Sequence, residues 1–295
     1  MSQATDPARQ AAEPEHQTAE PARQTAESVR AEIGVIGGSG FYSLVQGARE
    51  VPVSTPYGDP SSPLMIAEVA GRTVAFLPRH GENHAFPPHR INYRANLWAL
   101  RSVGVRQVLA PCAVGSLRPD YGPGRILIPD QLVDRTHGRI QTYFDQGAVH
   151  VPFADPYCSA GRETVLKTAA DSGVTGVVDG GAMVVIEGPR FSTRAESRSY
   201  ARQGWPIVNM TGHPEAVLAR ELALCYTAIA LVTDLDAGAE AGQGVSQAEV
   251  FAAFGRNIEK LRELLLHVIG AMPKSRDCAC TTAHDGLTLP IELPN

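Results

Sequence analysis

Positive charge is scarce in this chain. Only three of its 295 residues are lysine, and 26 basic residues face 31 acidic ones, for a net charge of −5. A nucleic-acid binder carries a broad basic surface, so this balance argues against that class of protein. The chain also lacks any apolar run near the roughly 18 residues of a membrane helix; its strongest stretch is 228–232. We therefore expect no nucleic-acid partner and no membrane span.

Cysteine is also sparse, with five residues scattered along the sequence. Five are too few for the disulfide framework of a secreted scaffold. The N-terminus has no apolar segment of the kind that secretory signals contain. We therefore expect a cytoplasmic protein, and 43% hydrophobic residues are enough to build a sizeable core.

The first 30 residues differ in composition from the rest of the chain. They consist almost wholly of Ala, Glu, Gln, Pro, Thr and Arg, and the phrase Pro-Ala-Arg-Gln begins at both Pro7 and Pro21. Such a segment cannot bury enough apolar surface to offset the entropy cost of ordering it. We expect a disordered tail over residues 1–30 and a single domain over residues 31–295.

Apolar runs that end at glycine or polar residues alternate with helical patterns along the domain. The runs predict strands over 33–36, 73–77, 107–113, 125–129, 182–186, 206–210 and 226–233. Helical spacing and capping residues predict helices over 91–102, 162–172, 193–202, 214–222 and 246–269. This alternation indicates an α/β fold with a central mixed β-sheet flanked by helices. Ligands of such sheets bind beyond the carboxyl ends of strands.

Unusual polar residues follow several of these strands. The loop Gly37–Gly40 can aim backbone N–H groups and the Ser39 hydroxyl at an anion. Its spacing fits neither a dinucleotide fingerprint nor a P-loop, and a plain turn is equally compatible. Arg79 and His80 follow the second strand, where an arginine fork suits phosphate or carboxylate. A surface ion pair is the alternative for Arg79.

Three histidines close together also suggest a metal site, but the glycine and prolines among them disfavour one helix that holds the ligands. They are His80, His84 and His89.

Two carboxylates follow the most apolar strand. Asp234 and Asp236 are two residues apart, so both point to the same side of an extended chain. Burial and the proximity of two like charges raise the pKa of a carboxyl group, which lets it act as a general acid. A solvated acidic turn is the alternative.

Eight stretches, in this order, resemble the purine nucleoside phosphorylase family, in its methylthioadenosine-cleaving branch. They are Ile36–Gly40, Arg79–Gly81, Asn92–Ala99, Gly115–Leu117, Asp130–Thr136, Glu187–Ser192, Asn209–Thr211 and Thr233–Asp236. The resemblance covers about residues 33–269. It implies the fold of that family and a reaction in which phosphate attacks C1′ of 5′-methylthioadenosine. The products are adenine and 5-methylthioribose 1-phosphate, and no metal or organic cofactor is needed because phosphate is a co-substrate.

The resemblance also implies roles for individual residues. The phosphate ligands would be Ser39, Arg79, His80, Cys112, Ala113 and Thr211. Phe191 and Ser192 would contact the purine, and Met210 the ribose. Asp234 would face N7 and stabilise its proton, with Asp236 near the 6-amino group. His150 would reach the 5′ end of the nucleoside in a neighbouring subunit, which implies a homotrimer with shared sites.

One cysteine departs from the family pattern, and the other four match positions in some thermophilic relatives. Cys112 stands where many of them carry a phosphate-binding threonine, and a thiol is a weaker donor. The resemblance also implies that Cys158 and Cys225 lie close together, and Cys278-Ala-Cys280 matches a C-x-C of thermophilic relatives. In a reducing cytoplasm we expect the last two as thiols.

Three alternative functions stay open. A related phosphorylase could prefer 6-oxopurines such as inosine or methylthioinosine, but such enzymes tend to carry asparagine where Asp234 stands. A nucleotide-binding dehydrogenase would use the glycine loop, which lacks the required spacing. A catalytically silent nucleoside-binding protein is the third.

Overall fold

The computed structural model describes residues 29–38, 47–237 and 244–294. The predicted tail up to residue 28 and the predicted phosphate ligand Ser39 lie outside the described residues. Val29 already packs in the core at 7% exposure.

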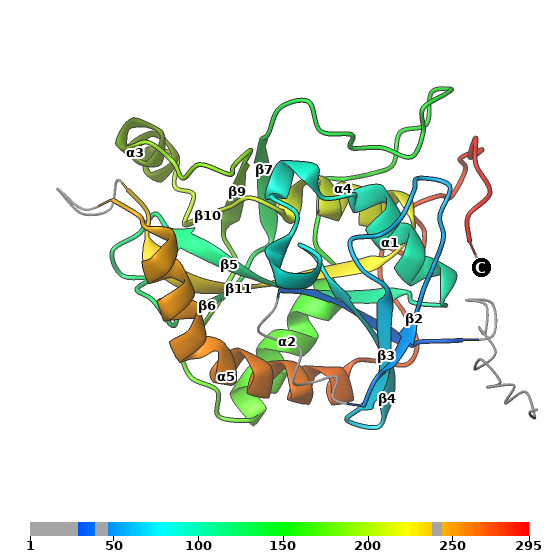
Figure 1. Ribbon diagram of the computed structural model, residues 1–295, viewed down its shortest axis with the longest axis horizontal. Coiled ribbons are helices and arrows are strands. Elements are labelled where there is room, and N and C mark those ends of the chain that lie inside the picture. The colour runs from blue at the N-terminus through cyan, green and yellow to red at the C-terminus, as the bar shows by residue number, and fades with distance from the viewer. Residues whose placement is uncertain (1–28, 39–46, 238–243, 295) are drawn as a thin grey trace, which may run out of the picture.

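One large mixed sheet forms the centre of the fold, as the sequence predicts (Figure 1). Its strands are β1 (Ile33–Gly37), β2 (Arg49–Val51), β3 (Leu64–Val69), β4 (Arg72–Pro78), β5 (Gln107–Ser116), β6 (Ile126–Ile128), β7 (Gln131–Arg135), β8 (Val177–Asp179), β9 (Ala182–Ile186), β10 (Ile207–Asn209) and β11 (Cys225–Leu235). The main order is β2-β3-β4-β1-β5-β10-β9-β7, and the sheet branches at β5, which also pairs β11. Strand β6 then joins β11 to β8.

Four neighbouring strands run parallel, and this sets the position of the site. β4 pairs β1, β1 pairs β5 and β5 pairs β11, all in parallel. Their carboxyl ends therefore meet at one edge of the sheet. β10 runs antiparallel to the end of β5, with Ile207 opposite Ser116, so the residues after β10 lie back along β5, near Ala113.

Helices cover both faces of the sheet. They are α1 (Tyr93–Ser102), α2 (Ser159–Asp171), α3 (Arg194–Arg202), α4 (Gly212–Glu221) and α5 (Gln247–Ala271), with two short 3-10 helices at Glu82–His84 and Pro88–Arg90. Figure 1 shows α1 and α4 over one face and α2 and α5 over the other. A separate hydrophobic cluster fills the space under each pair.

The predicted elements are recovered with shifted ends. The capping box at Thr193 begins α3 as expected, and the Ser246 hydroxyl caps α5. Helix α2 begins three residues early because the Cys158 side chain caps it. The break predicted at Asp234 was wrong, since β11 continues to Leu235. β2, β3, β7 and β8 were not predicted.

Among the helices of the described part, none combines the length and apolarity that a membrane crossing requires.

Candidate active site

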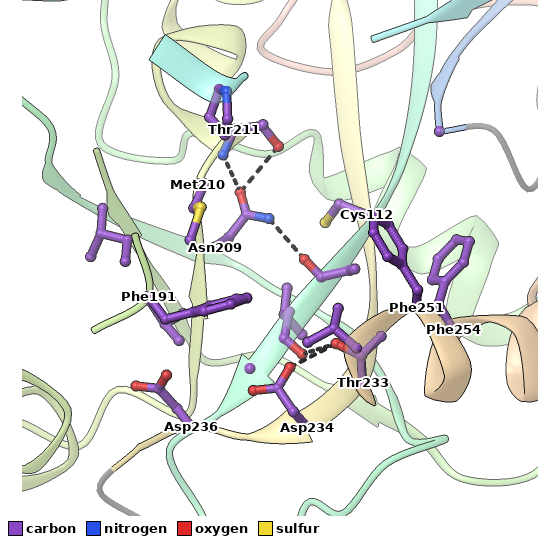
Figure 2. A pocket seen from close by; sticks show the side chains of 18 of the residues that line it. Cys112, Phe191, Asn209, Met210, Thr211, Thr233, Asp234, Asp236, Phe251 and Phe254 are labelled. Atoms are coloured by element: carbon purple, nitrogen blue, oxygen red, sulfur yellow. Dashed lines mark hydrogen bonds between the residues drawn. The ribbon is translucent and has the colours of Figure 1, made fainter. Parts of the chain in front are cut away.

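The carboxyl edge of the parallel strands holds a cavity of about 220 Å³. Its lining brings together most of the residues that the sequence singled out. These are Arg79, His80, Cys112, Ala113, Phe191, Ser192, Met210, Thr211, Asp234 and Asp236. Gly38, next to the undescribed Ser39, also lines it. In Figure 2, Thr211 and Cys112 lie toward one end of this cavity, Asp234 and Asp236 lie toward the other, and the Phe191 ring projects between them.

A β-bulge places Asp234 in the cavity. The register of β11 against β5 shifts between Val232 and Asp234, so Thr233 is the extra residue. Such a bulge re-aims the side chains that follow it. Across from it stands Gly115, where a Cβ atom would come within 3.0 Å of Asp234 Oδ1. The absence of a side chain at position 115 therefore leaves room for the carboxyl group.

The environment of Asp234 favours its protonated form. Burial raises the pKa to about 6, and the nearby Asp236 charge adds to this effect. The Thr233 hydroxyl opposes the shift by donating a hydrogen bond to Asp234 Oδ2 over 2.8 Å. The sequence predicted this direction from burial and from the two paired carboxylates, and it is confirmed.

Asp236 lies deeper than Asp234, at 3% exposure. Burial raises its pKa, while the Ser197 hydroxyl of α3 opposes the shift by hydrogen bonding to Asp236 Oδ2. The buried Ser192 hydroxyl acts on Asp236 in the same direction as Ser197, so it lies beside this carboxyl group at the cavity wall.

At the other end, Asn209 shapes the loop that carries Met210 and Thr211. Its Oδ1 accepts a hydrogen bond from the backbone N–H group of Thr211 (Figure 2) and another from that of Gly212, each over 2.7 Å. Its Nδ2 donates to the Ala113 carbonyl over 3.0 Å, which ties this loop to β5. Asn209 therefore positions both Thr211 and the end of β5 at the cavity wall.

The Arg79 guanidinium is not open toward a ligand anion, as the sequence suggested, but is bound by the protein itself. Its Nε and Nη2 donate to the two carboxylate oxygens of Glu215 over 2.7 and 2.9 Å. Nη1 donates to the Pro111 carbonyl and Nη2 also to that of Ile36. Of the five N–H donors of a guanidinium, this leaves only one, on Nη1. The fork binds a protein carboxylate, and the alternative of a surface ion pair is excluded because Arg79 is 3% exposed.

Glu215 completes a buried polar group behind the cavity. It is 1% exposed, and its Oε2 also accepts from the Tyr226 hydroxyl over 2.7 Å. Burial opposes the charged form of Arg79, but the Glu215 carboxylate outweighs it and keeps the arginine pKa raised. A buried charge needs such a partner. The pair fixes the Arg79 guanidinium group beside the cavity.

His80 presents an acceptor to the cavity. Its Nδ1 lies 2.9 Å from the Phe86 carbonyl, which can only accept, so Nδ1 carries the proton. Burial lowers the pKa of His80 to about 4, so the ring is neutral and Nε2 has a free lone pair. The ring stacks on His84 with centroids 4.7 Å apart, and His84 meets Phe251 edge-on. Such an Nε2 suits a ligand hydroxyl or a protonated phosphate oxygen.

The thiol of Cys112 lines the cavity in its neutral form. Burial raises its pKa to about 12, although the Arg79 charge acts in the opposite direction. It therefore offers a weak S–H donor and no negative charge that would repel an anion.

Several lining residues escaped the sequence analysis. Val250, Phe251 and Phe254 of α5 close one side of the cavity, as Figure 2 shows for the two phenylalanines. Phe251 is 48% exposed, an unusual position for a large apolar side chain. Two aromatic residues at positions i and i+3 near a helix start could have indicated a ligand-contacting face. The same pattern is equally typical of an ordinary helix face that packs in the core.

One predicted site residue lies apart from the others. His150 is exposed, in a stretch of chain without helix or strand, and it does not line this cavity. Its predicted role belongs to a neighbouring subunit, which a single chain does not test.

The comparisons with known proteins agree with this arrangement. Residues 32–270 match the model of the phosphorylase superfamily. The chain is 61% identical to a purine nucleoside phosphorylase of Streptomyces coelicolor over 90% of this chain and 99% of that one. It is 60% identical to an S-methyl-5′-thioadenosine phosphorylase of Mycolicibacterium smegmatis over 89% and 99%. A solved methylthioadenosine phosphorylase from Schistosoma mansoni in complex with adenine superposes with a TM-score of 0.76, at 36% identity, covering 81% of this chain and 91% of that one. The chain belongs to the phosphorylase superfamily.

Proposed function

We propose that this protein cleaves 5′-methylthioadenosine with inorganic phosphate, yielding adenine and 5-methylthioribose 1-phosphate. The observation that carries the proposal is Asp234, a buried carboxyl with a raised pKa, at the opposite end of one cavity from Thr211 (Figure 2). Cleavage of a purine nucleoside needs a proton donor at the base and an anion site at the sugar, and this cavity places candidates for both.

With the proton donor at one end of the cavity and the anion site at the other, the reaction proceeds as follows. A phosphate oxygen forms a bond to C1′ as the C1′–N9 bond breaks, and the bonding electron pair passes to the purine. Charge develops on the ring, and protonated Asp234 gives its proton to N7. The sugar passes through an oxocarbenium-like state, which the phosphate charge stabilises from below. Phe191 offers a flat surface for the base.

Several residues would bind the phosphate, each in a different way. Thr211 offers its hydroxyl, neutral His80 accepts from a protonated phosphate oxygen, and Arg79 contributes its fixed charge and one remaining N–H. The Cys112 thiol and the backbone at Ala113 complete this end. Phosphate is itself the nucleophile, so the proposed reaction uses no metal or organic cofactor.

The choice of base rests on the same carboxyl group. In the reactive form the proton of Asp234 faces N7, so the other carboxyl oxygen can only accept, which suits a 6-amino group and not a 6-oxygen. This favours adenine over hypoxanthine. A purine nucleoside phosphorylase is among the relatives most similar to the chain, so 6-oxopurine cleavage is the second candidate function.

The assembly and the compartment are also part of the proposal. We infer a homotrimer in which His150 of each chain reaches the 5′ end of the nucleoside bound in the neighbouring subunit. Exposed Ile140, in the same stretch of chain, supports a partner on this face. None of the five described cysteines forms a disulfide, which fits a reducing cytoplasm.

The decisive experiment measures adenine release from methylthioadenosine with and without phosphate. We expect release only with phosphate, together with methylthioribose 1-phosphate in equal amount. Thr211→Val, which keeps the shape but removes the hydroxyl, should raise the KM for phosphate about tenfold, the effect of one hydrogen bond to a charged group. The KM for the nucleoside should change little. Release without phosphate would contradict phosphorolysis.

A further inference from the structure

Four of the five cysteines meet at one point far from the cavity. Cys158 begins α2, Cys225 begins β11, and Cys278 and Cys280 lie in the segment that follows α5. All four sulfur atoms lie within 4.8 Å of one another. Three of the side chains are 2–3% exposed and Cys278 is half-buried. The predicted proximity of Cys158 and Cys225 is thereby confirmed.

The spacing of the sulfur atoms fits a tetrahedral metal ion. With Zn–S bonds of about 2.3 Å, the sulfur atoms of a tetrahedral site made of four cysteines lie about 3.8 Å apart. Cys225 Sγ and Cys278 Sγ are 3.4 Å apart, and no pair exceeds 4.8 Å, so small side-chain rotations would complete the tetrahedron. A disulfide needs only two neighbouring sulfurs, whereas here every pair is close. Four soft sulfur ligands select zinc over calcium or magnesium.

Several positively polarised groups lie close to the cluster. The Gly161 N–H, in the first turn of α2, donates to Cys158 Sγ over 3.4 Å. A helix N-terminus stabilises a thiolate. Arg276 Nη1 lies 4.0 Å from Cys225 Sγ, and the charge of Arg220 acts on Cys280. These groups offset part of the net negative charge that four thiolates and one Zn²⁺ carry.

We propose that Cys158, Cys225, Cys278 and Cys280 form a structural zinc site. The ion would join the segment after α5 to the starts of α2 and β11. That segment contains no helix or strand up to residue 294. Hydrogen bonds such as Arg276 to the Ala223 carbonyl and His284 to the Glu221 carbonyl attach it, together with apolar contacts of Leu289, Ile291 and Leu293. With no open coordination position, the ion would serve folding and not the reaction.

The site and the cavity lie at opposite ends of β11. Nine residues separate Cys225 from Asp234 on this strand, roughly 30 Å at the usual rise per residue. Loss of zinc should therefore lower thermal stability while the folded enzyme keeps its kcat at 25 °C.

The test measures metal in untagged protein purified under reducing conditions, by elemental mass spectrometry. We expect one zinc per chain, and near zero for the double variant Cys278→Ser, Cys280→Ser. Cys112→Ser is the matched control, because Cys112 lies outside the cluster and its zinc content should not change. Removing zinc from wild type with a thiol reagent and chelator, then reducing it, should lower Tm by at least about 5 °C. Returning zinc should restore it.

A second measurement covers the case in which the double variant does not fold. The reduced metal-free wild type should take up one Co²⁺ with the absorption of a tetrahedral tetrathiolate complex. Protein that holds no zinc and takes up neither zinc nor Co²⁺ would overturn the proposal. So would intact protein that lacks four thiol hydrogens, because the cluster would then be two disulfides.

Discussion

At the residue scale, Asp234 has two proposed roles: it donates a proton to the base, and it selects which base binds. Asparagine at this position keeps the size and accepts from Thr233, but it cannot supply a proton. It can donate to a 6-oxygen, which an ionised carboxylate cannot do. Asp234→Asn should therefore lose activity on methylthioadenosine and gain relative activity on methylthioinosine.

The expected change in the ratio of the two kcat/KM values is about ten- to a hundredfold. This corresponds to roughly 1–3 kcal/mol for one mispaired polar group, before the loss of acid catalysis is added. The measurement is kcat/KM for both nucleosides in wild type and variant. If the ratio stays constant, Asp234 does not read the base, and the preference for adenine over hypoxanthine loses its main support.

The raised pKa of Asp234 also predicts a pH dependence. The reactive form is protonated, and its fraction falls as the pH rises through about 6. At saturating phosphate, kcat/KM for the nucleoside should therefore decline toward high pH, with an apparent pKa of about 6 or higher because bound phosphate adds negative charge.

Asp234→Asn serves as the control for this profile, because phosphate itself titrates in the same range. A decline that disappears in the variant belongs to Asp234, whereas one that persists unchanged belongs to phosphate. The second outcome would argue against Asp234 as the acid.

At the element scale, one buried ion pair connects three parts of the fold. Arg79 follows β4, Glu215 lies on α4, and Tyr226 lies on β11. Glu215→Gln leaves the Arg79 charge buried without a counter-charge and should reduce the free energy of unfolding by about 3–5 kcal/mol. Tyr226→Phe removes only one hydrogen bond to the carboxylate and should cost about 1.5–3 kcal/mol.

Urea unfolding of the two variants beside wild type measures this difference. We also expect Glu215→Gln to raise the KM for phosphate, since it frees the arginine fork from its fixed position. Two variants of equal stability would show that the pair contributes no more than the hydroxyl contact.

The same ion pair illustrates what the sequence could and could not predict. Apolar runs and capping residues correctly predicted most strands and all five α-helices, because these signals depend only on local sequence. The strand ends also located the cavity. The partner of Arg79 is 136 residues away in the chain, so no local pattern identified it. Strand β2 has three residues, two of them exposed, and carries no periodicity that could be recognised.

The α5 phenylalanines were missed for a different reason. A helix pattern reports which face is apolar, but not whether that face meets the sheet or a ligand. The break predicted at Asp234 failed because a bulge lets a polar residue continue a strand.

At the scale of the whole molecule, the proposed trimer predicts two separable effects. The residues between β7 and α2 carry both exposed Ile140, at 60% exposure, and His150, and neither lines the cavity of its own chain. If a neighbouring subunit covers this stretch, Ile140→Glu buries a charge in the contact and should reduce the assembly to monomers of 31.5 kDa.

His150→Ala should leave the assembly intact but raise the KM for the nucleoside about tenfold, as one lost polar contact does. Light scattering on a sizing column measures the mass, and initial rates measure the KM. An active His150→Ala trimer with unchanged KM would leave the site complete within one chain, and a fully active wild-type monomer would contradict the trimer itself.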